Sequence, residues 1–298
     1  MTTQTANVLN TPEKSTNVRS HVSSPLWLRA SFSTAGYVAP ELTAAVAEKL
    51  FFRTRRRAAR PGEREVLETA TTSSIDGMKA WSWGEGPTVL LVHGWNGRGT
   101  QLGGFVEPLV ERGFRVVAFD AFGHGESPGD SMSIPELANC IRQVSDALGG
   151  LYGVVAHSMG GAATTVALAN GLELERAVFI SPPADPREFL RIYGDALAIS
   201  EEVRAHMKER VERRLGITMQ SMRATTIAPS MHVPLLVVHD QNDKEVPVDS
   251  GQAIARTWPN AELMLTEGLG HQRILHSEHV TNVAVSFIDA LQHRKHAA

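Results

Sequence analysis

The sequence holds a single cysteine, Cys140, among 298 residues. One cysteine cannot form a disulfide within the chain, and this suits a reducing compartment. No apolar run approaches the roughly 18 residues that span a bilayer. The first forty residues are rich in Ser and Thr and lack the apolar centre of a signal peptide. We therefore expect a cytoplasmic protein without membrane insertion.

Neither sign of charge dominates the chain. The 29 Lys and Arg and 32 Asp and Glu give a formal net charge of -3, so no overall field draws the chain to nucleic acid or anionic membrane. The basic run at 53–60 is short and isolated. We interpret it as a solvated helix end, where positive charges suit the helix dipole, and we expect no nucleic-acid partner.

Nucleotide and metal motifs are also missing. There is no G-x-G-x-x-G or G-x-x-x-x-G-K-[ST] loop, and His and Cys do not cluster at metal-ligand spacing. The sequence therefore predicts no cofactor and no metal.

Hydrophobic residues make up 42% and charged residues 20%, which is ordinary for a globular protein. The length allows one large domain with a sizeable core.

Short apolar runs alternate with helical segments along most of the chain. Continuous apolar runs are typical of strands buried on both faces of a parallel sheet, and strand–helix alternation implies right-handed crossovers. The fold class is thus α/β, a mostly parallel central sheet with helices on both faces. The apolar runs are 88–92, 115–119, 152–155, 177–180, 234–238 and 262–265. The helices are expected at about 101–112, 134–148, 160–169, 250–257 and 274–291. Two short edge strands are expected at 65–71 and 78–83.

The domain plan has three parts. Residues 1–40 are expected to form a poorly ordered tail. Residues 41–298 are expected to form one α/β domain, which begins with a helix that carries Leu42, Val46 and Leu50 on one face. An insertion at about 183–230 replaces a single connecting helix and predicts a helical lid. Within it, Ser200 caps a helix that stops at Gly216.

Polar residues follow directly after the buried strands. Parallel sheets place their sites at the carboxyl ends of strands, so these residues should gather at one edge. They are His93, Asp120, Ser158, Ser181, Asp240 with Asp243, and His271.

The segment 154–161 carries the strongest motif. Ser158 lies on an expected tight strand-to-helix turn, with the small residues Ala156 and Gly160 two positions to either side. This segment resembles the G-x-S-x-G nucleophile motif of the α/β-hydrolase superfamily, with Ala156 in place of the first glycine. The resemblance implies that Ser158 is the nucleophile and that the Met159 N–H faces the oxyanion. His93-Gly94-Trp95 resembles the loop that supplies the second oxyanion-hole donor, here the N–H of Trp95.

Two further segments resemble the acid and base loops of the family. In Val238–Pro247, Asp243 stands three residues before Val-Pro and is implied as the catalytic acid. Asp240 is interpreted as bracing the turn, and Asp185 is a rival for the acid. In Gly268-Leu-Gly-His, His271 is implied as the base.

The loop 119–127 resembles the family's D-x-x-G-x-G-x-S loop, and we interpret it as scaffold shaped by Asp120 and its glycines. His93 is taken as a structural histidine, and His124 is not assigned to the site. The resemblance spans about 78–291. It makes residues 41–298 an α/β-hydrolase domain with a lid, and it needs no cofactor.

The predicted activity is that of a serine hydrolase acting on a small-molecule carboxylic ester. A serine at the turn argues against relatives that use aspartate there, such as haloalkane dehalogenases. Apolar lid residues favour a small to medium acyl chain; they are Phe189, Leu190, Ile192, Met207, Met219 and Met222.

Three alternatives stay open. The same triad serves thioesterases and carbon–carbon bond hydrolases, and the latter need lid cations, for which Arg187, Arg191 and Arg273 are candidates. A non-catalytic ligand-binding protein on this fold is the third. The oligomeric state is not readable from the sequence.

Overall fold

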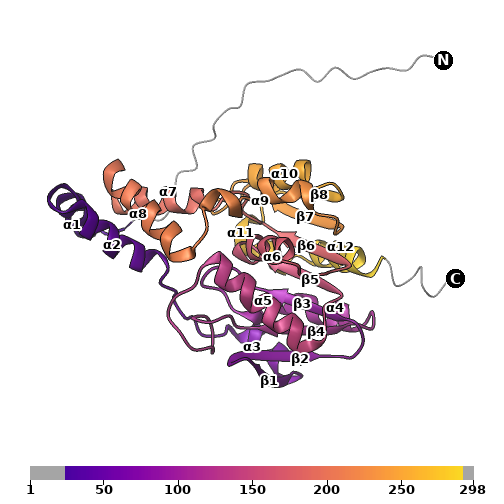
Figure 1. Cartoon of the computed structure of the whole chain (residues 1–298). Coiled ribbons are helices and arrows are strands. Elements are labelled where there is room, and N and C mark those ends of the chain that lie inside the picture. The colour runs from indigo at the N-terminus through magenta and orange to yellow at the C-terminus, as the bar shows by residue number, and fades with distance from the viewer. Residues whose placement is uncertain (1–23, 291–298) are drawn as a thin grey trace, which may run out of the picture.

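A computed structural model describes residues 24–290. Its centre is one eight-stranded sheet with the order β1-β2-β4-β3-β5-β6-β7-β8 (Figure 1). β1 and β2 run antiparallel to their neighbours, and the other pairs are parallel, as the sequence predicts. The strands are β1 Thr71–Ile75, β2 Met78–Trp83, β3 Thr88–Val92, β4 Arg115–Phe119, β5 Gly153–His157, β6 Arg176–Ile180, β7 Leu235–Asp240 and β8 Ala261–Thr266.

Successive residues of the central strands enter two different cores. In β3, Leu90 and Val92 belong to one cluster, while Val89 and Leu91 belong to the other. Side chains alternate across a sheet, so a strand covered on both faces must be apolar throughout. The first cluster is covered by α5 Ile134–Leu148, α6 Met159–Ala169 and α10 Val248–Thr257, and the second by the 3-10 helix η1 Gly99–Phe105, α4 Val106–Val110 and α12 Glu278–Asp289.

The predictions at the margins of the sheet are partly wrong. Residues 65–70 form no strand, because Pro61 occupies the first turn of a helix, α3 Pro61–Glu68, and β1 starts only at Thr71, the last residue of the expected strand. The run 262–265 lies in β8, but β8 pairs with β7 alone, and Leu263 and Leu265 are 39% and 40% exposed. An apolar run therefore does not by itself distinguish an edge strand from a central one.

Two expected helices are each divided in the structure. The segment 101–112 consists of η1 and α4. The segment 274–291 begins with η4 Ile274–His276, which continues from α11 Gly270–Arg273, and α12 follows after the Ser277 cap. No helix within residues 24–290 combines the length and apolar character that crossing a membrane requires.

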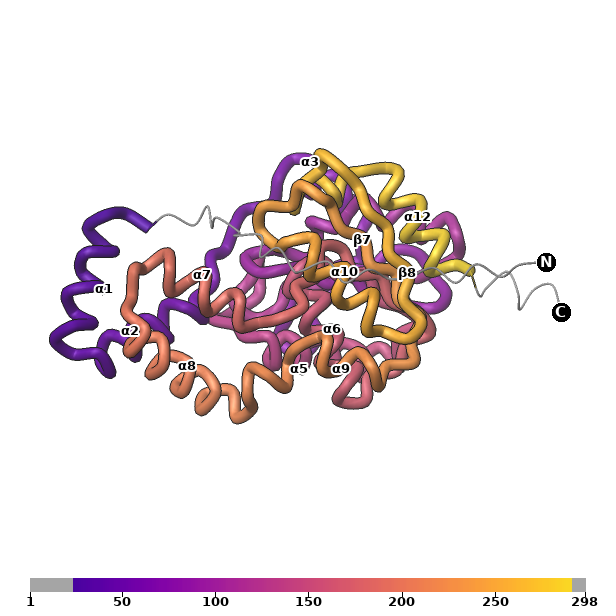
Figure 2. Tube along the Cα trace, turned by 90° about the horizontal axis from the view of Figure 1, so that it is seen from above, coloured from indigo at the N-terminus to yellow at the C-terminus, as the bar shows by residue number. Residues whose placement is uncertain are grey.

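The amino-terminal segment corrects the domain plan. Residues 26–38 were expected to be irregular, yet they form α1 Leu26–Val38, which turns directly into α2 Pro40–Phe51. Pro40 starts the second helix at a position where a missing N–H costs nothing. The expectation of a disordered tail for 1–23 lies outside the described residues. Figures 1 and 2 show both helices beside the lid helices, away from the sheet.

The lid is helical, and its predicted helix is confirmed in detail. α8 Glu201–Leu215 begins at Ser200, whose Oγ accepts the N–H of Val203 at 3.3 Å, and ends at Gly216 with φ of 69°. The sequence missed α7 Arg187–Leu197. The rest of the lid consists of η2 Met219–Met222, α9 Ala224–Ile227 and η3 Ala228–Ser230.

The lid is joined to the amino-terminal helices. Glu48 of α2 is 7% exposed and pairs with Arg210 of α8 at 2.9 Å, and the Arg214 guanidinium lies 4.2 Å from the centre of the Phe52 ring. Ala44 and Ala47 are fully buried at the same side of α2. The cap on the sheet therefore has two parts, residues 26–52 and 187–230.

Candidate active site

Ser158 lies on a strained turn between β5 and α6. Its backbone has φ of 51° and ψ of -122°, a region that non-glycine residues rarely adopt. The turn is tight because α6 passes close to β3: a Cβ on Gly160 would lie 2.7 Å from the backbone oxygens of Val92 and His93. The small residue predicted at 160 is thus required by the approach of helix and strand.

The loop after β3 lies against this turn. A Cβ on Gly94 would come within 3.0 Å of the Ser158 Cβ, so only glycine lets the loop approach so closely. The next N–H belongs to Trp95, and the first N–H of α6 belongs to Met159. Within residues 24–290 neither N–H has a hydrogen-bond partner. The two predicted oxyanion donors therefore come from segments that meet at Ser158.

Asp243 and His271 form a buried pair. His271 Nδ1 lies 2.7 Å from Asp243 Oδ2, and Asp243 Oδ1 accepts the N–H groups of Glu245 and Val246 at 2.8 and 2.9 Å. Burial would raise the pKa of the Asp243 carboxyl, but these donors outweigh it and hold the pKa below its ordinary value. The ionised carboxylate only accepts, so the His271 proton is on Nδ1 and its Nε2 is free to accept one.

The serine and the histidine are neighbours without a direct bond. The ring of His157, the residue before Ser158, lies 4.7 Å centre to centre from the His271 ring, and its Nε2 donates to the His271 backbone oxygen at 3.0 Å. No hydrogen bond joins Ser158 to the His271 side chain among the described residues. In ligand-free enzymes such bonds are often long and tighten when substrate is present.

The two other aspartates are separate from His271. Asp240 is buried and accepts from the Asn242 and Leu269 N–H groups and the Thr266 hydroxyl at 2.8–3.0 Å, so it braces the turn as predicted and ties the acid loop to the base loop. Asp185 is bound by the Arg187 guanidinium. Neither contacts His271.

The loop 119–127 is scaffold, in agreement with the sequence. Asp120 accepts the N–H groups of Gly99 and Glu126, both at 2.8 Å. His93 accepts the N–H of Ala121 at Nε2 and is fully buried. Burial lowers the pKa of His93 to about 4 and that of His124 to about 3, so both rings are neutral.

The sequence did not reveal three side chains around the pair. His157 supports the His271 backbone, as described above. His239 is fully buried, donates from Nε2 to the Val246 oxygen and lies 3.6 Å from Asp243. The Glu245 carboxylate is 4.0 Å from His271 Nε2. His157 and His239 sit one residue before Ser158 and Asp240, and this adjacency is the signal that could have drawn attention to them.

The lid residues differ in their placement. Met207, Met219 and Met222 are at most 3% exposed and pack within the core cluster. Leu190 is half-buried against the same cluster. Phe189 and Ile192 are also half-buried, and they remain as candidates to contact substrate.

The arginines of the basic run are solvated, as expected, but most of the run lies beyond the helix end. α2 stops at Phe51, and residues 54–60 form an extended strap along the site loops. The Arg55 N–H donates to Asn96 Oδ1 at 2.7 Å, and Arg56 donates to the Gly129 oxygen at 2.7 Å. The strap thereby fixes the residue after Trp95.

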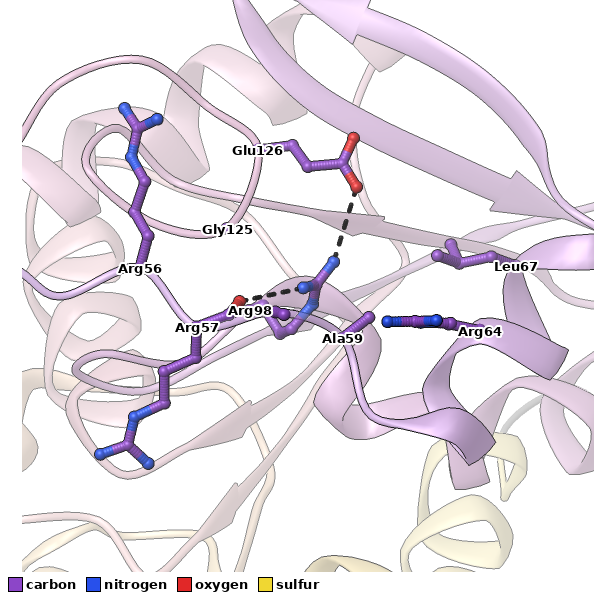
Figure 3. A pocket seen from close by; sticks show the side chains of 9 residues that line it. Arg56, Arg57, Ala59, Arg64, Leu67, Arg98, Gly125 and Glu126 are labelled. Carbon is purple, nitrogen blue, oxygen red and sulfur yellow. Dashed lines mark hydrogen bonds and ion pairs between the residues drawn. The ribbon is translucent and has the colours of Figure 1, made fainter.

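The buried Arg98 side chain binds this strap through the Arg57 backbone oxygen. It is 5% exposed, and it contacts Glu63 at 3.3 Å, the Arg57 oxygen at 3.1 Å and Glu126 at 3.7 Å. Figure 3 shows its guanidinium between the last two, beside a cavity of about 480 Å³, while the Arg56 and Arg57 side chains point away in different directions. The cavity is therefore not a convergent arginine cluster.

Replacing Arg98 with Met is expected to destabilise the protein by about 3 kcal/mol, because it leaves the buried Glu63 carboxylate without its cation. The double replacement of Glu63 and Arg98 by Met should recover part of this loss, since no buried charge then remains. Urea unfolding of the three proteins measures both effects. Glu126→Gln serves as the control, because its half-exposed carboxylate should contribute little.

Comparison with known proteins places this chain in a family. The model of the alpha/beta hydrolase family matches residues 89–284. The chain is 26% identical over 251 residues to a pimeloyl-[acyl-carrier protein] methyl ester esterase of Xanthomonas campestris, covering 70% of this chain and 97% of the relative. It is 26% identical over 231 residues to a 2-hydroxy-6-oxononadienedioate/2-hydroxy-6-oxononatrienedioate hydrolase of Dechloromonas aromatica, covering 62% and 80%.

A solved structure shows the same fold. The bromoperoxidase from Bacillus anthracis superposes with a TM-score of 0.55 at 20% identity and covers 74% of this chain and 99% of that one. The family model spans well over half of the chain, and the sheet and its helices agree with the fold that the motifs imply. The chain belongs to the alpha/beta hydrolase family.

Proposed function

We propose that this hydrolase-family protein cleaves carboxylic esters through an acyl-enzyme at Ser158. The observation that carries the proposal is the buried Asp243–His271 pair at 2.7 Å, next to a serine on a strained strand-to-helix turn. Such a carboxylate holds the imidazole in the tautomer whose Nε2 accepts a proton, and it stabilises the imidazolium that forms.

The reaction has two halves. In the first, Ser158 Oγ attacks the ester carbonyl, His271 Nε2 takes the hydroxyl proton, and the oxyanion is bound by the N–H groups of Trp95 and Met159. The carbon–oxygen bond to the alcohol breaks as His271 returns the proton to the leaving oxygen. In the second half, His271 removes a proton from water, the hydroxide attacks the acyl carbon, and Ser158 leaves with that proton while the acid is released.

The three candidate arginines are already bound to other groups of the protein, and this favours ester hydrolysis over carbon–carbon bond cleavage. A dicarboxylate such as the one in the name of the Dechloromonas relative needs a cation for its carboxylate. Here Arg187 is bound to Asp185, Arg191 bridges Glu188 and Asp195, and Arg273 donates to the Gly268 oxygen. Thioester hydrolysis does not need a cation for a substrate carboxylate, so a thioester remains the second candidate substrate.

We also infer a cytoplasmic location. Its support is the cysteine content of the sequence: a single cysteine, Cys140, cannot form a disulfide within the chain, which suits a reducing compartment. Fractionation of the native host with an antibody to the chain tests this inference, and recovery outside the cytoplasm would contradict it.

Hydrolysis of p-nitrophenyl acetate, butyrate and octanoate tests the proposed activity. We expect turnover by the wild type, highest for a short or medium chain, and a loss of roughly 10⁴-fold or more in Ser158→Ala. Ser181→Ala is the matched control, since it removes a buried hydroxyl at the neighbouring strand end without touching the proposed reaction. A fluorophosphonate probe should label the wild type but not Ser158→Ala.

Two results would overturn the proposal. Equal turnover by wild type and Ser158→Ala would show that another group is the nucleophile. Absence of both turnover and labelling in the folded wild type would favour a ligand-binding role on this fold.

A further inference from the structure

The residues that follow β3 form a tight turn. The Gly97 N–H donates to the Gly94 oxygen at 3.0 Å, so residues 94–97 close a four-residue turn. Its third residue, Asn96, has φ of 52°. A positive φ at this position is typical of a type II turn, and asparagine is one of the few residues besides glycine that adopt it. The second residue of the turn is Trp95, whose N–H we propose as an oxyanion donor.

The first residue of the turn is held from inside the protein. His93 Nε2 accepts the N–H of Ala121 at 3.1 Å, so the ring proton of His93 is on Nδ1, which donates to the Gly94 oxygen at 2.8 Å. His93 is fully buried. This side of the turn is therefore bound to the segment that follows β4.

The outer end of the turn is bonded to the strap. The Arg55 N–H donates to Asn96 Oδ1 at 2.7 Å, and among residues 24–290 this is the only hydrogen bond that Asn96 makes. Trp95 makes none within the same range. The bond to residue 55 therefore restrains the part of the turn that carries the Trp95 N–H.

The strap is itself held on both sides of Arg55. Thr54 is 7% exposed, and its N–H donates to the Asp130 oxygen at 2.9 Å. On the other side, the Arg57 oxygen accepts from the buried Arg98 side chain at 3.1 Å (Figure 3). Because contacts flank Arg55, its N–H has a fixed position from which to hold the turn.

We propose that the strap positions the Trp95 oxyanion donor: the Arg55 N–H holds Asn96 Oδ1, and this bond keeps the Trp95 N–H directed at the carbonyl oxygen of the substrate. The inference rests on the ester hydrolysis proposed above. A preorganised donor stabilises the oxyanion because it need not reorient as the charge develops. Asn96 and Arg55 are positioning residues, since they act through Trp95 and not on the substrate.

The same bond connects the turn to the cap. The strap follows α2, and α2 packs on α8 through the Glu48–Arg210 ion pair. The amino-terminal part of the cap is thus connected to the proposed oxyanion donor by the few residues between Phe51 and Arg55. This connection gives a segment outside the sheet a role in the reaction.

Asn96→Gly tests the bond while keeping the shape of the turn. Glycine adopts the same positive φ but has no side chain to accept the Arg55 N–H. We expect kcat for the best p-nitrophenyl ester to fall about 10-fold, less than the roughly 10²–10³ that complete loss of a donor costs. KM should change by less than about twofold, because the oxyanion exists only in the transition state.

The strap supplies the reciprocal variants. Arg55→Pro removes the donating N–H without altering the turn, so it should also lower kcat about 10-fold. Arg55→Ala is the matched control, because it keeps the N–H and removes only an exposed side chain. The double variant of Asn96→Gly and Arg55→Pro should lose no more than either single variant, since both break the same bond.

A transition-state analogue separates positioning from a general loss of structure. A trifluoromethyl ketone adds to Ser158 Oγ, the hydroxyl proton passes to His271, and the former carbonyl oxygen becomes an oxyanion. Its inhibition constant should rise about 10-fold in Asn96→Gly, in parallel with the fall in kcat, and stay unchanged in Arg55→Ala. Thermal unfolding followed by circular dichroism establishes that each variant is folded.

Deuterium exchange measures the bond without any substrate. The Arg55 amide should exchange more slowly in the wild type than in Asn96→Gly, because a bonded N–H exchanges only when the bond opens. Mass spectrometry of peptides that span residue 55 provides the measurement.

Failure of this inference and failure of the proposed reaction give different results. A wild-type kcat in folded Asn96→Gly, or a double variant whose loss is the product of the two single losses, would overturn the positioning role and leave ester hydrolysis standing. Equal exchange of the Arg55 amide in wild type and Asn96→Gly would overturn it as well. Turnover that persists in Ser158→Ala, or no turnover by the wild type, would overturn the reaction and the positioning role together.

Discussion

Replacing Asp243 with Asn is expected to lower kcat/KM for the best ester substrate by about 10⁴-fold while leaving the protein folded. The Asp243 carboxylate accepts the Nδ1 proton of His271 at 2.7 Å. An amide in its place presents an N–H₂ group as readily as an oxygen, so the imidazole turns to the tautomer with its proton on Nε2. That nitrogen then cannot take the proton of Ser158.

The competing aspartate supplies the control. Asp185→Asn changes the same carboxylate to the same amide at the end of the neighbouring strand, where Arg187 and not His271 is the partner. We expect this variant to keep the wild-type rate. A comparable loss in both variants, or a larger loss in Asp185→Asn, would reassign the acid. Urea unfolding of each variant separates loss of activity from loss of fold.

Lowering the pH from 7 to 5 is expected to remove a large part of the free energy of unfolding. Burial is the largest cause that lowers the pKa of three histidines in the folded protein, to about 4 for His93 and about 3 for His124 and His157. In the unfolded chain each has its ordinary pKa near 6.5. Below that value the unfolded state binds protons that the folded state does not, so stability falls as the pH falls.

The size of this effect follows from proton linkage. Three protons taken up only on unfolding give a slope of up to about 4 kcal/mol per pH unit between roughly pH 6 and 4, and no slope from these groups above about pH 7.5. Domains have only about 5–15 kcal/mol of stability in total. Urea unfolding at pH 8, 7, 6 and 5 measures the slope. A flat profile down to pH 5 would contradict the prediction.

Local sequence determined the elements whose ends are set by their own residues. Ser200 and Gly216 bound α8 because a hydroxyl can accept the first free N–H and a glycine adopts the left-handed closing turn. The six apolar runs gave six strands. Ser158, Asp243 and His271 could be chosen because each follows a strand of one parallel sheet, and the carboxyl ends of such strands meet at one edge.

The site itself was only partly predictable. The proposed acid could be separated from Asp185 and Asp240 by motif, and of these three aspartates the structure places only Asp243 against His271. The supporting residues could not be found in this way. His157 and His239 donate to the backbone oxygens of His271 and Val246, and a backbone oxygen, which every residue carries, leaves no mark in the sequence.

The amino-terminal segment shows why the remainder needed the tertiary structure. Nothing in its composition says that residues 54–60 run beside the loop after β3. The Arg55 N–H donates to the Asn96 side chain, the Arg56 guanidinium donates to the Gly129 oxygen, and the Arg57 oxygen accepts from Arg98, and none of these contacts follows from a pattern in the segment. The sequence by itself determined the family fold and its three proposed reacting residues, since these depend on local turns and strand order. Tertiary structure alone decided the two-part cap and the strap, because burial there depends on which surfaces meet across the fold.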